Sequence, residues 1–541
     1  MTVEILSRIQ FALTISFHFL FPPMTIGLSV MLVVMQTLRV RTGNPLYVEM
    51  AKFWTRVFGL IFAIGVATGI PMEFQFGTNW AHYARFVGDI FGGPLAIEGI
   101  YAFFLESGFL ALLLFGWNKI GPKMHLFATC MVSLGAHFSA IWILVANSWM
   151  QTPAGFHLAR QVKVAADGQQ FPLSTNLGDV PFKLQEIALP TNYVVQPGDL
   201  GQIRAVVDSF PDAILNPSTL DRLAHTIIAC WITGAFVVTA VSAWWLLRGR
   251  HEESARASLK IGLAGATIAC LLQMVSADST ARGVSRNQPL KLAALEGLQQ
   301  SQKNASMGVV GAVRWKRDAS GQIIGVEENA IRIPGMLSVL VSGNFLHPIQ
   351  ASETVVPGLE QLPSDDFLRR RHPGASDAEL KKLRPDYWPN VPVVFQTYHL
   401  MISIGVALTG ITLLGCLLWW RGKLWNTKSK PVRAFLALLS ACIVLPQIAC
   451  QAGWFTAEMG RQPWIVYQVL KTGEAISAVV RAPQVITSII LFSIIYLLIS
   501  ALFLMLFARL IRQGPGHGDP DKSIFERWQP LSLKGERHTR K

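Results

Sequence analysis

The sequence predicts an all-α polytopic membrane protein with about nine transmembrane helices and two long outer loops. Hydrophobic residues make up 51% of its 541 residues and charged residues only 15%, and the mean hydropathy is +0.39. A soluble domain carries roughly 25% charged residues, so this composition excludes an ordinary soluble protein. Apolar runs long enough to cross about 30 Å of hydrocarbon recur along the chain and predict helices that span a bilayer.

Nine apolar runs define the expected spans in chain order. They lie near residues 10–37, 53–75, 95–117, 125–147, 223–247, 258–277, 395–420, 432–452 and 484–508. Two connections are much longer than the others, and loops of such length usually carry function or are disordered. The expected organisation is helices 1–4 within 1–149, an outer loop over 150–222, helices 5–6 within 223–277, a second outer loop over 278–392, helices 7–9 within 393–512 and a basic tail over 513–541.

Lysine and arginine gather in every second connection between the expected spans and in the C-terminal tail. These residues are Arg39, Arg41, Lys52, Lys119, Lys123, Arg248, Arg250, Arg256, Lys260, Arg421, Lys423, Lys428, Lys430, Arg433, Arg509, Arg512, Lys534, Arg537, Arg540 and Lys541. The positive-inside rule assigns such segments to the cytoplasm, so we expect the N-terminus outside and the C-terminus inside. The net charge of +14 therefore reflects topology, and we predict no nucleic-acid partner.

The six cysteines all fall within or beside apolar runs, without any CxxC or CxxCH motif. This pattern predicts no covalent c-type haem, no zinc cluster and no disulfide framework. The first apolar segment lacks a basic n-region and an A-x-A cleavage site. We therefore expect it to be retained as a span.

Glu458 and Arg461 lie where the eighth apolar run should meet water, in the stretch Trp454-Phe-Thr-Ala-Glu-Met-Gly-Arg-Gln-Pro-Trp464. Ionisable groups at membrane depth are costly and face a partner or a cavity. Glu458 is therefore a candidate site residue, with Arg461 as its counter-charge, and Pro463 turns the chain outward. The alternative is a helix end closed by an ordinary ion pair.

The third expected span carries two carboxylates, Glu98 and Glu106. Eight residues on an α-helix correspond to about 80° of rotation and about 12 Å of rise, so the two acids would share a broad face at two depths. Such a pair indicates a metal-cofactor ligand or a proton relay. A paired structural charge is the alternative.

Several spans carry histidine or methionine. His18 precedes Phe-Leu-Phe-Pro22-Pro23, and the missing N–H of Pro22 should loosen the helix beside the imidazole. His225 opens the fifth span and Met401 the seventh. Each of these three could instead be an ordinary packed residue, and we interpret His137 in the fourth span as structural.

Six of these residues map to the outer halves of spans that are far apart in sequence: His18, Glu98, Glu106, His225, Met401 and Glu458. Histidine, methionine and carboxylate form an iron-type ligand set, and a His/Met pair is an axial combination of electron-transfer haem. The spans contain no His-His pair or cysteine-rich site that would suit copper.

Several blocks of sequence match one family. They are Leu6-Ser-Arg-Ile-Gln-Phe-Ala-Leu-Thr, His18-Phe-Leu-Phe, Gly65-Val-Ala-Thr-Gly, Met72-Glu-Phe-Gln-Phe-Gly-Thr-Asn-Trp80, Pro94-Leu-Ala-Ile-Glu-Gly, Trp142-Ile-Leu-Val-Ala-Asn, Lys291-Leu-Ala-Ala-Leu-Glu296 and Gly460-Arg-Gln-Pro-Trp464. On these blocks the chain resembles subunit I of the cytochrome bd-type quinol oxidases, over all nine expected helices.

The resemblance implies a terminal oxidase of the bacterial inner membrane that oxidises quinol on the outer side and reduces O2 to water without pumping protons. It implies three cofactors: a low-spin haem b, a high-spin haem b and a haem d. It also implies two partners within the lipid bilayer, a second membrane subunit and a small single-span subunit.

The resemblance also assigns roles to residues. His225 and Met401 match the axial ligands of the low-spin haem, and His18 and Glu458 match ligands of the high-spin pair, in an order that the sequence leaves open. The other matching residues are Glu98 and Glu106, beside that pair and on the proton route; Arg8, Arg461 and Trp454, near the same haems; and Lys291 and Glu296, the quinol-interacting pair.

Two features of the second loop and the inner half of the bundle follow from physical chemistry. Lys291 and Glu296 would diverge by about 140° on a helix, so we expect that stretch to wrap the quinol ring or to depart from regular helix. Glu106, Ser107 and Ser139 are the polar groups expected on a proton path from the inside.

Three departures from the family pattern limit the transfer of roles. The connection over 150–220 is longer than the family leads us to expect. Position 399 is His where Arg is expected beside the low-spin haem, and Arg282 and Arg286 stand where acidic residues are common. Quinone preference and inhibitor response therefore stay open.

Two other classes of protein remain as alternatives. A proton-coupled secondary transporter would use the buried carboxylates as a relay, but it predicts inverted repeats, which the sequence lacks. A dihaem cytochrome b anchor would need paired histidines on two helices, whereas His125 and His137 share one. A reduced-minus-oxidised optical spectrum separates the three classes.

Overall fold

The computed structural model describes residues 2–173, 175–178, 180–191, 193–196, 199 and 201–516. Within them, nine helical segments are long and apolar enough to cross a membrane, which confirms the predicted number. They are α1–α2 (Val3–His18 and Pro22–Thr42), α3 (Pro45–Thr78), α4–η1–α5 (Ala81–Ile97, Glu98–Phe103 and Phe104–Phe115), α6 (Pro122–Gln151), α8 (Thr219–Leu247), α9 (Glu252–Asn287), α15 (Val391–Trp420), α16–η6–α17 (Lys430–Ala441, Cys442–Val444 and Leu445–Met459) and α18 (Ala482–Gln513).

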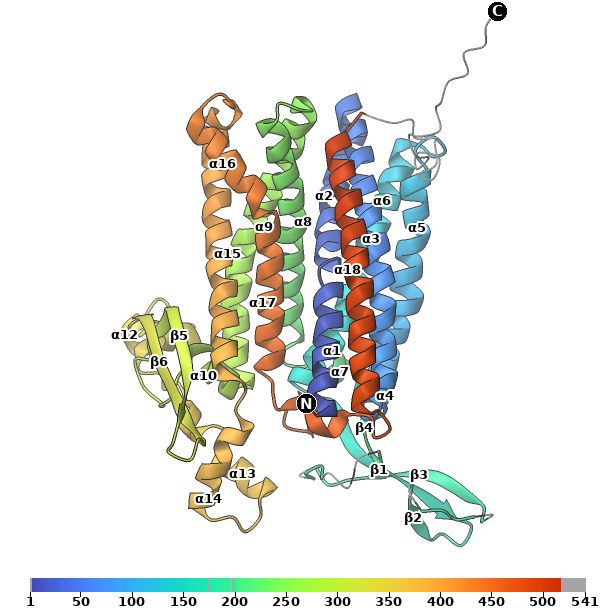
Figure 1. Cartoon of the computed structure of the whole chain (residues 1–541), viewed down its shortest axis with the longest axis vertical. Helices are drawn as coiled ribbons and strands as arrows, with labels where there is room; N and C mark the ends of the chain where they lie inside the picture. Colours follow the sequence, from blue (N-terminus) through green and yellow to red (C-terminus); the bar gives the residue numbers. More distant parts are fainter. Residues whose placement is uncertain are drawn as a thin grey trace, which may run out of the picture.

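The helices run side by side as one bundle (Figure 1). The N-terminus and both long connections lie at one end, called the loop end below, and α18 finishes at the opposite end. The short connections that carry the lysine and arginine clusters lie at that opposite end. The expectation of a basic cytoplasmic tail over its final residues, from 517 onward, falls outside the described residues.

Two expected spans are interrupted rather than continuous. α1 ends at His18, and α2 begins at Pro22 after a short turn in which Phe21 N donates to His18 O at 3.1 Å. Because Pro22 has no N–H to continue the helical ladder, the loosening expected beside His18 takes the form of a full break between two helices. The expected single run over 432–452 is divided at η6, just before Pro446, for the same reason.

The centre of the bundle is packed by close approach of backbones. A Cβ on Gly27 of α2 would lie 2.0 Å from the carbonyl oxygen of Cys230 in α8, and Gly234 faces Gly27 in the same way. Small residues at a crossing let membrane helices approach closely. In contrast, only 6% of the apolar window of α18 is buried, so lipid or another chain must cover this helix.

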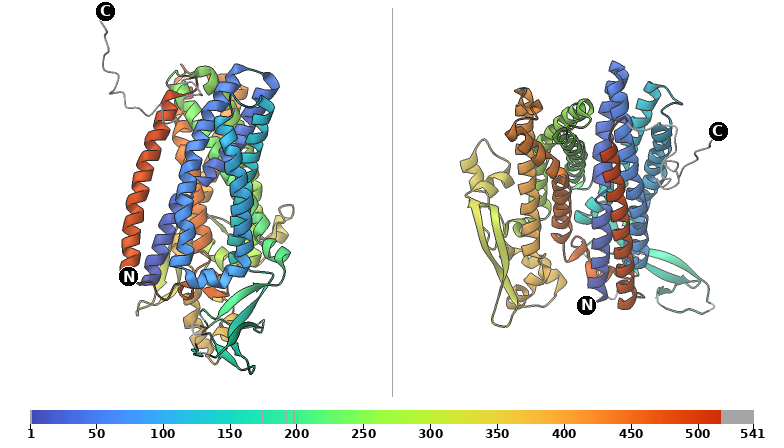
Figure 2. Two further views of the ribbon diagram at one scale, coloured as in Figure 1. Left: turned by 90° about the vertical axis from the view of Figure 1, so that its right-hand side faces the viewer. Right: turned by 45° about the horizontal axis from the view of Figure 1, so that its top comes forward.

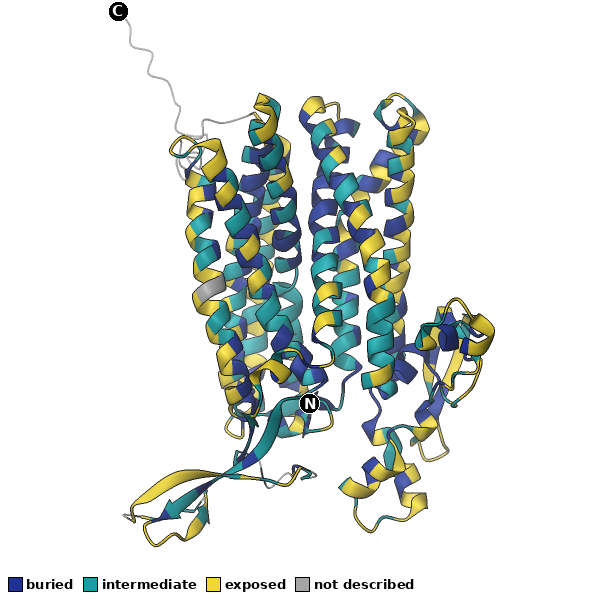
Figure 3. Ribbon diagram, turned by 180° about the vertical axis from the view of Figure 1, so that it is seen from behind, coloured by how far each residue is buried: buried dark blue, intermediate teal, exposed yellow. Residues whose placement is uncertain are grey.

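The first long connection folds into an antiparallel sheet. β1 (Phe156–Ala165) pairs with β2 (Gln170–Pro172), β3 (Phe182–Ala188) and β4 (Ile203–Val207). A short helix, α7 (Phe210–Ile214), leads to α8. The part made by β2 and β3 projects away from the bundle (Figure 2) and is largely exposed (Figure 3). This projecting part is called the β arm below.

The second long connection packs against α9 and α15. It begins with α10 (Pro289–Glu296) and a hairpin of β5 (Met307–Arg317) and β6 (Ile323–Ile333). The following elements are α11 (Met336–Ser342), α12 (Pro348–Ser352), η3 (Leu359–Gln361), α13 (Asp365–Arg371), α14 (Asp377–Leu383) and η4 (Arg384–Tyr387). Its last part contacts a small hairpin, β7 (Trp464–Val466) and β8 (Leu470–Lys471), through Tyr387 and Trp464.

Candidate functional site

Four positions of α6 contact four of the predicted site residues in succession. The α6 positions are Gly135, Ser139, Asn147 and Gln151. Each step of four residues gives about 6 Å of rise and about 40° of rotation, so they form a stripe that winds by about 160° around the helix. The stripe leads from the middle of the bundle to the loop end.

The inner half of the stripe holds the two carboxylates of the third span. Glu106 is buried against α6, because a Cβ on Gly135 would lie 2.9 Å from the Glu106 Cβ. The hydroxyl of Ser139 donates to Glu98 Oε1 at 2.7 Å. The intervening residues form the π-helical turn η1, so the rotation of about 80° expected for a regular α-helix does not apply. Ser107 donates to Phe103 O in its own helix.

The outer half of the stripe holds Glu458, near the end of α17. Asn147 Nδ2 donates to Glu458 Oε1 at 3.0 Å, and Arg461 Nη2 donates to Oε2 at 2.5 Å. Arg222 of α8 donates to the Asn147 amide oxygen. The Glu458 carboxylate is therefore held by α6 and by the turn that follows α17, and α8 supports it through Asn147.

Three cations surround this single carboxylate. Lys291 and Arg461 are each 3% exposed, and Lys291 Nζ donates to Gln151 Oε1 at 2.5 Å. Burial and the neighbouring guanidinium groups of Arg222 and Arg461 hold the pKa of Lys291 well below its ordinary value. Within the described residues, Nε and Nη1 of Arg461 are buried without a hydrogen-bond partner. Since buried charges need compensation, this cluster fits an additional anionic group.

His18 ends α1 beside α3. Its Nδ1 lies 3.1 Å from the Thr68 hydroxyl, which itself lies 3.0 Å from two backbone carbonyl oxygens. When the single hydroxyl proton points to a carbonyl oxygen, Nδ1 is the donor and Nε2 keeps its lone pair. A hydrogen bond that fixes the tautomer in this way is typical of metal-ligating histidine.

His225 and Met401 lie on α8 and α15, which both pack against α9 and α17. Gln273 Nε2 of α9 lies 3.0 Å from His225 Nε2 and 3.2 Å from Nδ1, so it can engage one nitrogen and leave the other. Met401 Sδ lies against α17, where a Cβ on Gly453 would be 2.7 Å from the sulfur. Only glycine leaves room for the thioether there.

Neither Arg8 nor Trp454 makes a hydrogen bond to the Glu458 cluster among the described contacts. Trp454 lies close to it on α17, whereas Arg8 lies on α1. Arg8 pairs with Glu4 at 3.7 Å and is 40% exposed. Arg8 and Glu4 line a cavity of about 480 Å³ at the loop end, together with Lys471 and Glu474. Trp454 is half-buried one turn before Glu458 and packs edge-on against Phe455.

Lys291 and Glu296 belong to a regular helix, α10, so the expectation of an irregular stretch is wrong. Pro289 at its start and Gly297 at its end, with φ of 63°, define the helix. The side chains leave on different sides, Lys291 toward α6 and Glu296 toward β5. Glu296 is 1% exposed and accepts from Gly308 N at 2.9 Å. Burial raises its pKa to about 7.

The histidines of α6 have their ring nitrogens engaged. His137 Nδ1 donates to Ser133 O at 2.7 Å, and its Nε2 accepts from Trp231 Nε1 at 2.9 Å. His125 bonds to Gln36 and to Leu113 O. Both are hydrogen-bonded core residues, which agrees with the structural interpretation of His137.

Four residues of the Glu458 cluster had no role assigned from the sequence: Asn147, Gln151, Arg222 and Gln288. A signal existed for three of them. Asn147 and Gln151 are polar residues four apart at the outer end of a span, and Arg222 stands one turn before His225. Gln288 carries no such signal.

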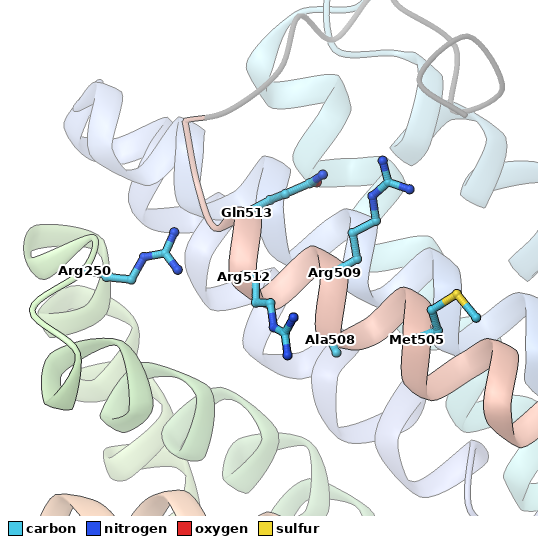
Figure 4. Close-up of a pocket in the computed structure, with 6 residues that line it drawn as sticks. All are labelled: Arg250, Met505, Ala508, Arg509, Arg512 and Gln513. Carbon is cyan, nitrogen blue, oxygen red and sulfur yellow. The ribbon is translucent and has the colours of Figure 1, made fainter. Parts of the chain in front are cut away.

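A second cavity lies at the end opposite the loop end. It has a volume of about 520 Å³ and is lined by Arg250 at the α8–α9 turn and by Arg509 and Arg512 of α18 (Figure 4). None of the candidate haem or quinol residues lines it. Arginines at such an edge are typical of a membrane interface.

The bundle and its buried histidine, methionine and carboxylate side chains define a multi-pass membrane protein suited to hold redox cofactors. More particularly, the chain belongs to the cytochrome bd terminal oxidase subunit I family, whose model matches residues 6–515. It is a quinol oxidase subunit and a multi-pass protein of the bacterial inner membrane. Membership of this family implies haem cofactors. The family membership confirms the resemblance and decides against the transporter and the dihaem anchor.

Known relatives cover the whole length. The cytochrome bd-II ubiquinol oxidase subunit 1 of Escherichia coli is 34% identical, over 98% of this chain and 99% of the relative. The cytochrome bd ubiquinol oxidase subunit 1 of Bacillus subtilis is 35% identical, over 96% and 95%. The solved bd oxidase of Geobacillus thermodenitrificans has a TM-score of 0.73 and 26% identity, over 95% and 99%.

Proposed function

We propose that this subunit oxidises quinol at the loop end, which faces the outside, and that O2 is reduced to water deeper in the bundle without proton pumping. The stripe on α6 supports this proposal, because it connects Lys291 of the second connection with Glu458, Glu98 and Glu106. Quinol chemistry and oxygen chemistry would thus be arranged along one helix.

The proposed cofactors are a low-spin haem b, a high-spin haem b and a haem d. When bound, they would supply single-electron transfer and the site of O2 reduction. His225 and Met401 would hold the low-spin haem. His18 and Glu458 are proposed to ligate the high-spin pair, in an order left open.

The residues around these ligands fit the acidic, planar character of haem. Arg222, Lys291 and Arg461 bring more positive charge than Glu458 can compensate, so haem carboxylates would complete the cluster. With Nδ1 donating to Thr68, His18 would keep its Nε2 lone pair for iron. The glycine at 453 leaves the Met401 sulfur free of a neighbouring side chain.

Glu296 is the proposed proton acceptor for the quinol. Its pKa of about 7 lies near the operating pH, where a general base is most effective. Lys291 leaves α10 on another side, so a quinol held by both residues would lie along this helix rather than in one narrow pocket.

Protons for water are proposed to enter from the opposite end, toward Glu106 and then Glu98 with Ser139. The basic connections at that end support its assignment to the cytoplasm. Proton release outside and proton uptake from inside would charge the membrane without a pump. The exposed apolar surface of α18 supports a second membrane subunit, and a small single-span subunit remains a family-based expectation.

A reduced-minus-oxidised spectrum of the purified membrane protein tests the proposal. We expect b-type bands together with a chlorin band in the red. A spectrum with b-type bands alone would contradict the haem d assignment, and the absence of all haem bands would contradict the ligand set.

A further inference from the structure

The cavity at the end opposite the loop end is lined by two parts of the chain. Its volume is about 520 Å³, far more than the roughly 30 Å³ that one water molecule occupies in the liquid. One side is the turn between α8 and α9, from which the Arg250 side chain extends toward α18 (Figure 4). The other side is formed by the last turns of α18, through Met505, Ala508, Arg509, Arg512 and Gln513.

Direct contacts hold the end of α18 against that turn. Trp245 Nε1 donates to Ile511 O at 2.9 Å, and both residues are buried. Gly514, with φ of 67°, lies so close to His251 that a Cβ there would stand 2.3 Å from the ring Nε2. Because each contact lies one residue from a lining arginine, the backbones on the two sides of the cavity keep a fixed separation.

The lining is strongly positive. Three of its six residues are arginines, and none is acidic. Within the described residues, Arg250 and Arg512 form no ion pair with a carboxylate, whereas Arg256 in the second turn of α9 pairs with Glu252 at 3.4 Å. Like charges around one cavity repel each other. A guanidinium group fits phosphate oxygens through two parallel N–H groups, so a bound phosphate would relieve this repulsion.

An apolar strip continues from the cavity along α18. Leu498, Leu502 and Met505 are separated by four and three residues, so they share one face of the helix. Each is exposed, from 42% at Leu502 to 66% at Leu498. The strip covers about 10 Å along the helix, and Arg512 stands seven residues beyond Met505 on the same face. A positive cavity therefore adjoins an apolar strip where the helix reaches the edge of the bilayer.

This combination matches the two parts of a glycerophospholipid. The phosphate brings negative charge and hydrogen-bond acceptors, and the acyl chains cover apolar surface just below it. A soluble anion would leave the apolar strip uncovered. A protein partner would need to bring carboxylates of its own to three arginines.

We propose that this cavity binds the phosphate of an anionic glycerophospholipid between Arg250 and Arg512, while an acyl chain lies along the apolar strip. The lipid would join α18 to the turn between α8 and α9. The site is distinct from the described candidate haem and quinol residues, none of which lines the cavity. This inference goes beyond the proposed function, since lipid binding requires no quinol oxidation.

Native mass spectrometry of the intact oxidase complex, freed of co-purified lipid in detergent, measures this binding. The double variant Arg250→Gln/Arg512→Gln, called the cavity variant, removes two charges and leaves Arg509 and Trp245 in place. Phosphatidylglycerol should bind to the parent at about tenfold lower concentration than to the cavity variant, because each arginine near a headgroup adds to the attraction. Phosphatidylcholine, which has no net charge, should bind equally to both.

Arg41→Gln/Arg421→Gln is the matched control. Both arginines are exposed at the ends of α2 and α15, on the same side of the bundle, and neither lines the cavity. The control should bind phosphatidylglycerol as the parent does. Equal affinity of parent and cavity variant overturns the proposal. An equal loss in the control also overturns it, because net charge rather than the cavity then governs binding.

Thermal unfolding distinguishes a lipid from a free anion. Phosphatidylglycerol should raise the unfolding temperature of the parent but not of the cavity variant, whereas inorganic phosphate at the same concentration should change neither. Stabilisation by phosphate equal to that by lipid overturns the lipid assignment. Release of another subunit from the cavity variant also overturns it, since a protein then occupies the cavity. If the cavity variant lacks haem, the single variants Arg250→Gln and Arg512→Gln replace it, each with an expected loss of about threefold.

Discussion

The two long connections lie at the same end of the bundle but differ in whether they bury charged side chains. Both carry exposed ion pairs, such as Arg204–Glu186 and His157–Asp208 in the first and Lys303–Glu353 in the second. In the second, Lys291 and Glu296 are almost fully buried, and His399 beside them has an unused nitrogen. From length and polar composition alone, both connections were expected to be long outer loops, without a difference between them. Burial of ionisable groups with unmet bonding capacity is what distinguishes the connection suited to act on a substrate.

The largest effect should come from the cluster that the second connection reaches through Lys291. Glu458→Ala removes a proposed haem ligand and leaves Arg461 buried without its carboxylate, which is strongly destabilising. We expect loss of one high-spin haem and at least a hundredfold loss of oxidase activity with any donor. Full haem content and normal turnover would return Glu458 to a structural role.

Glu296→Gln should lower the rate of quinol oxidation and leave the other activities of the protein unchanged. The amide keeps the shape of the side chain but removes the base, and general-base catalysis contributes about 10²–10⁴-fold. We expect a quinol oxidation rate at least a hundredfold lower, with haem content and artificial-donor activity near normal. A parallel fall of both activities would show that the second connection is no separate quinol site.

The pH profile provides a further test of the same residue. A base acts in its ionised form, and the pKa of Glu296 is raised to about 7 by burial. The kcat/KM for quinol should therefore rise with pH, with a midpoint near 7, and level off above it. Glu296→Gln should lack this limb, and its persistence would assign the titration to another group.

Lys291→Ala should have a smaller effect. The substitution removes the hydrogen bond to Gln151 and one buried positive charge, and a role in anchoring the quinol predicts a KM raised about three- to tenfold with little change in kcat. Steady-state kinetics with a soluble quinol measures both constants. A fall in kcat with all donors would instead link Lys291 to the haem cluster.

The smallest effect is expected in the β arm. Replacing residues 166–181 by a short Gly-containing turn would shorten the exposed hairpin while keeping the contact of β4 with α4 through Val207 N and Asp89. We expect quinol oxidation within about twofold of the parent rate. A large loss, with haem content retained, would erase the contrast between the two connections.

Much of the fold could be predicted because membrane spans depend on local composition. The nine runs and the break beside Pro22 follow from hydropathy and from the chemistry of proline. The sheet of the first connection and the directions of the α10 side chains depend on packing partners distant in sequence. Asn147 and Arg222 were missed for that reason, since only the folded chain brings them to Glu458.

The π-helical turn η1 sets the direction of the helix face beyond it. A turn with i→i+5 bonding holds one more residue than the α-helix that would replace it. If Glu98–Phe103 closed into an α-helix with every residue kept, everything beyond it would rotate by about 100°. Glu98 would stay beside Ser139, while Glu106 would leave Gly135. Two carboxylates facing one helix therefore depend on the π-helical turn as much as on their own side chains.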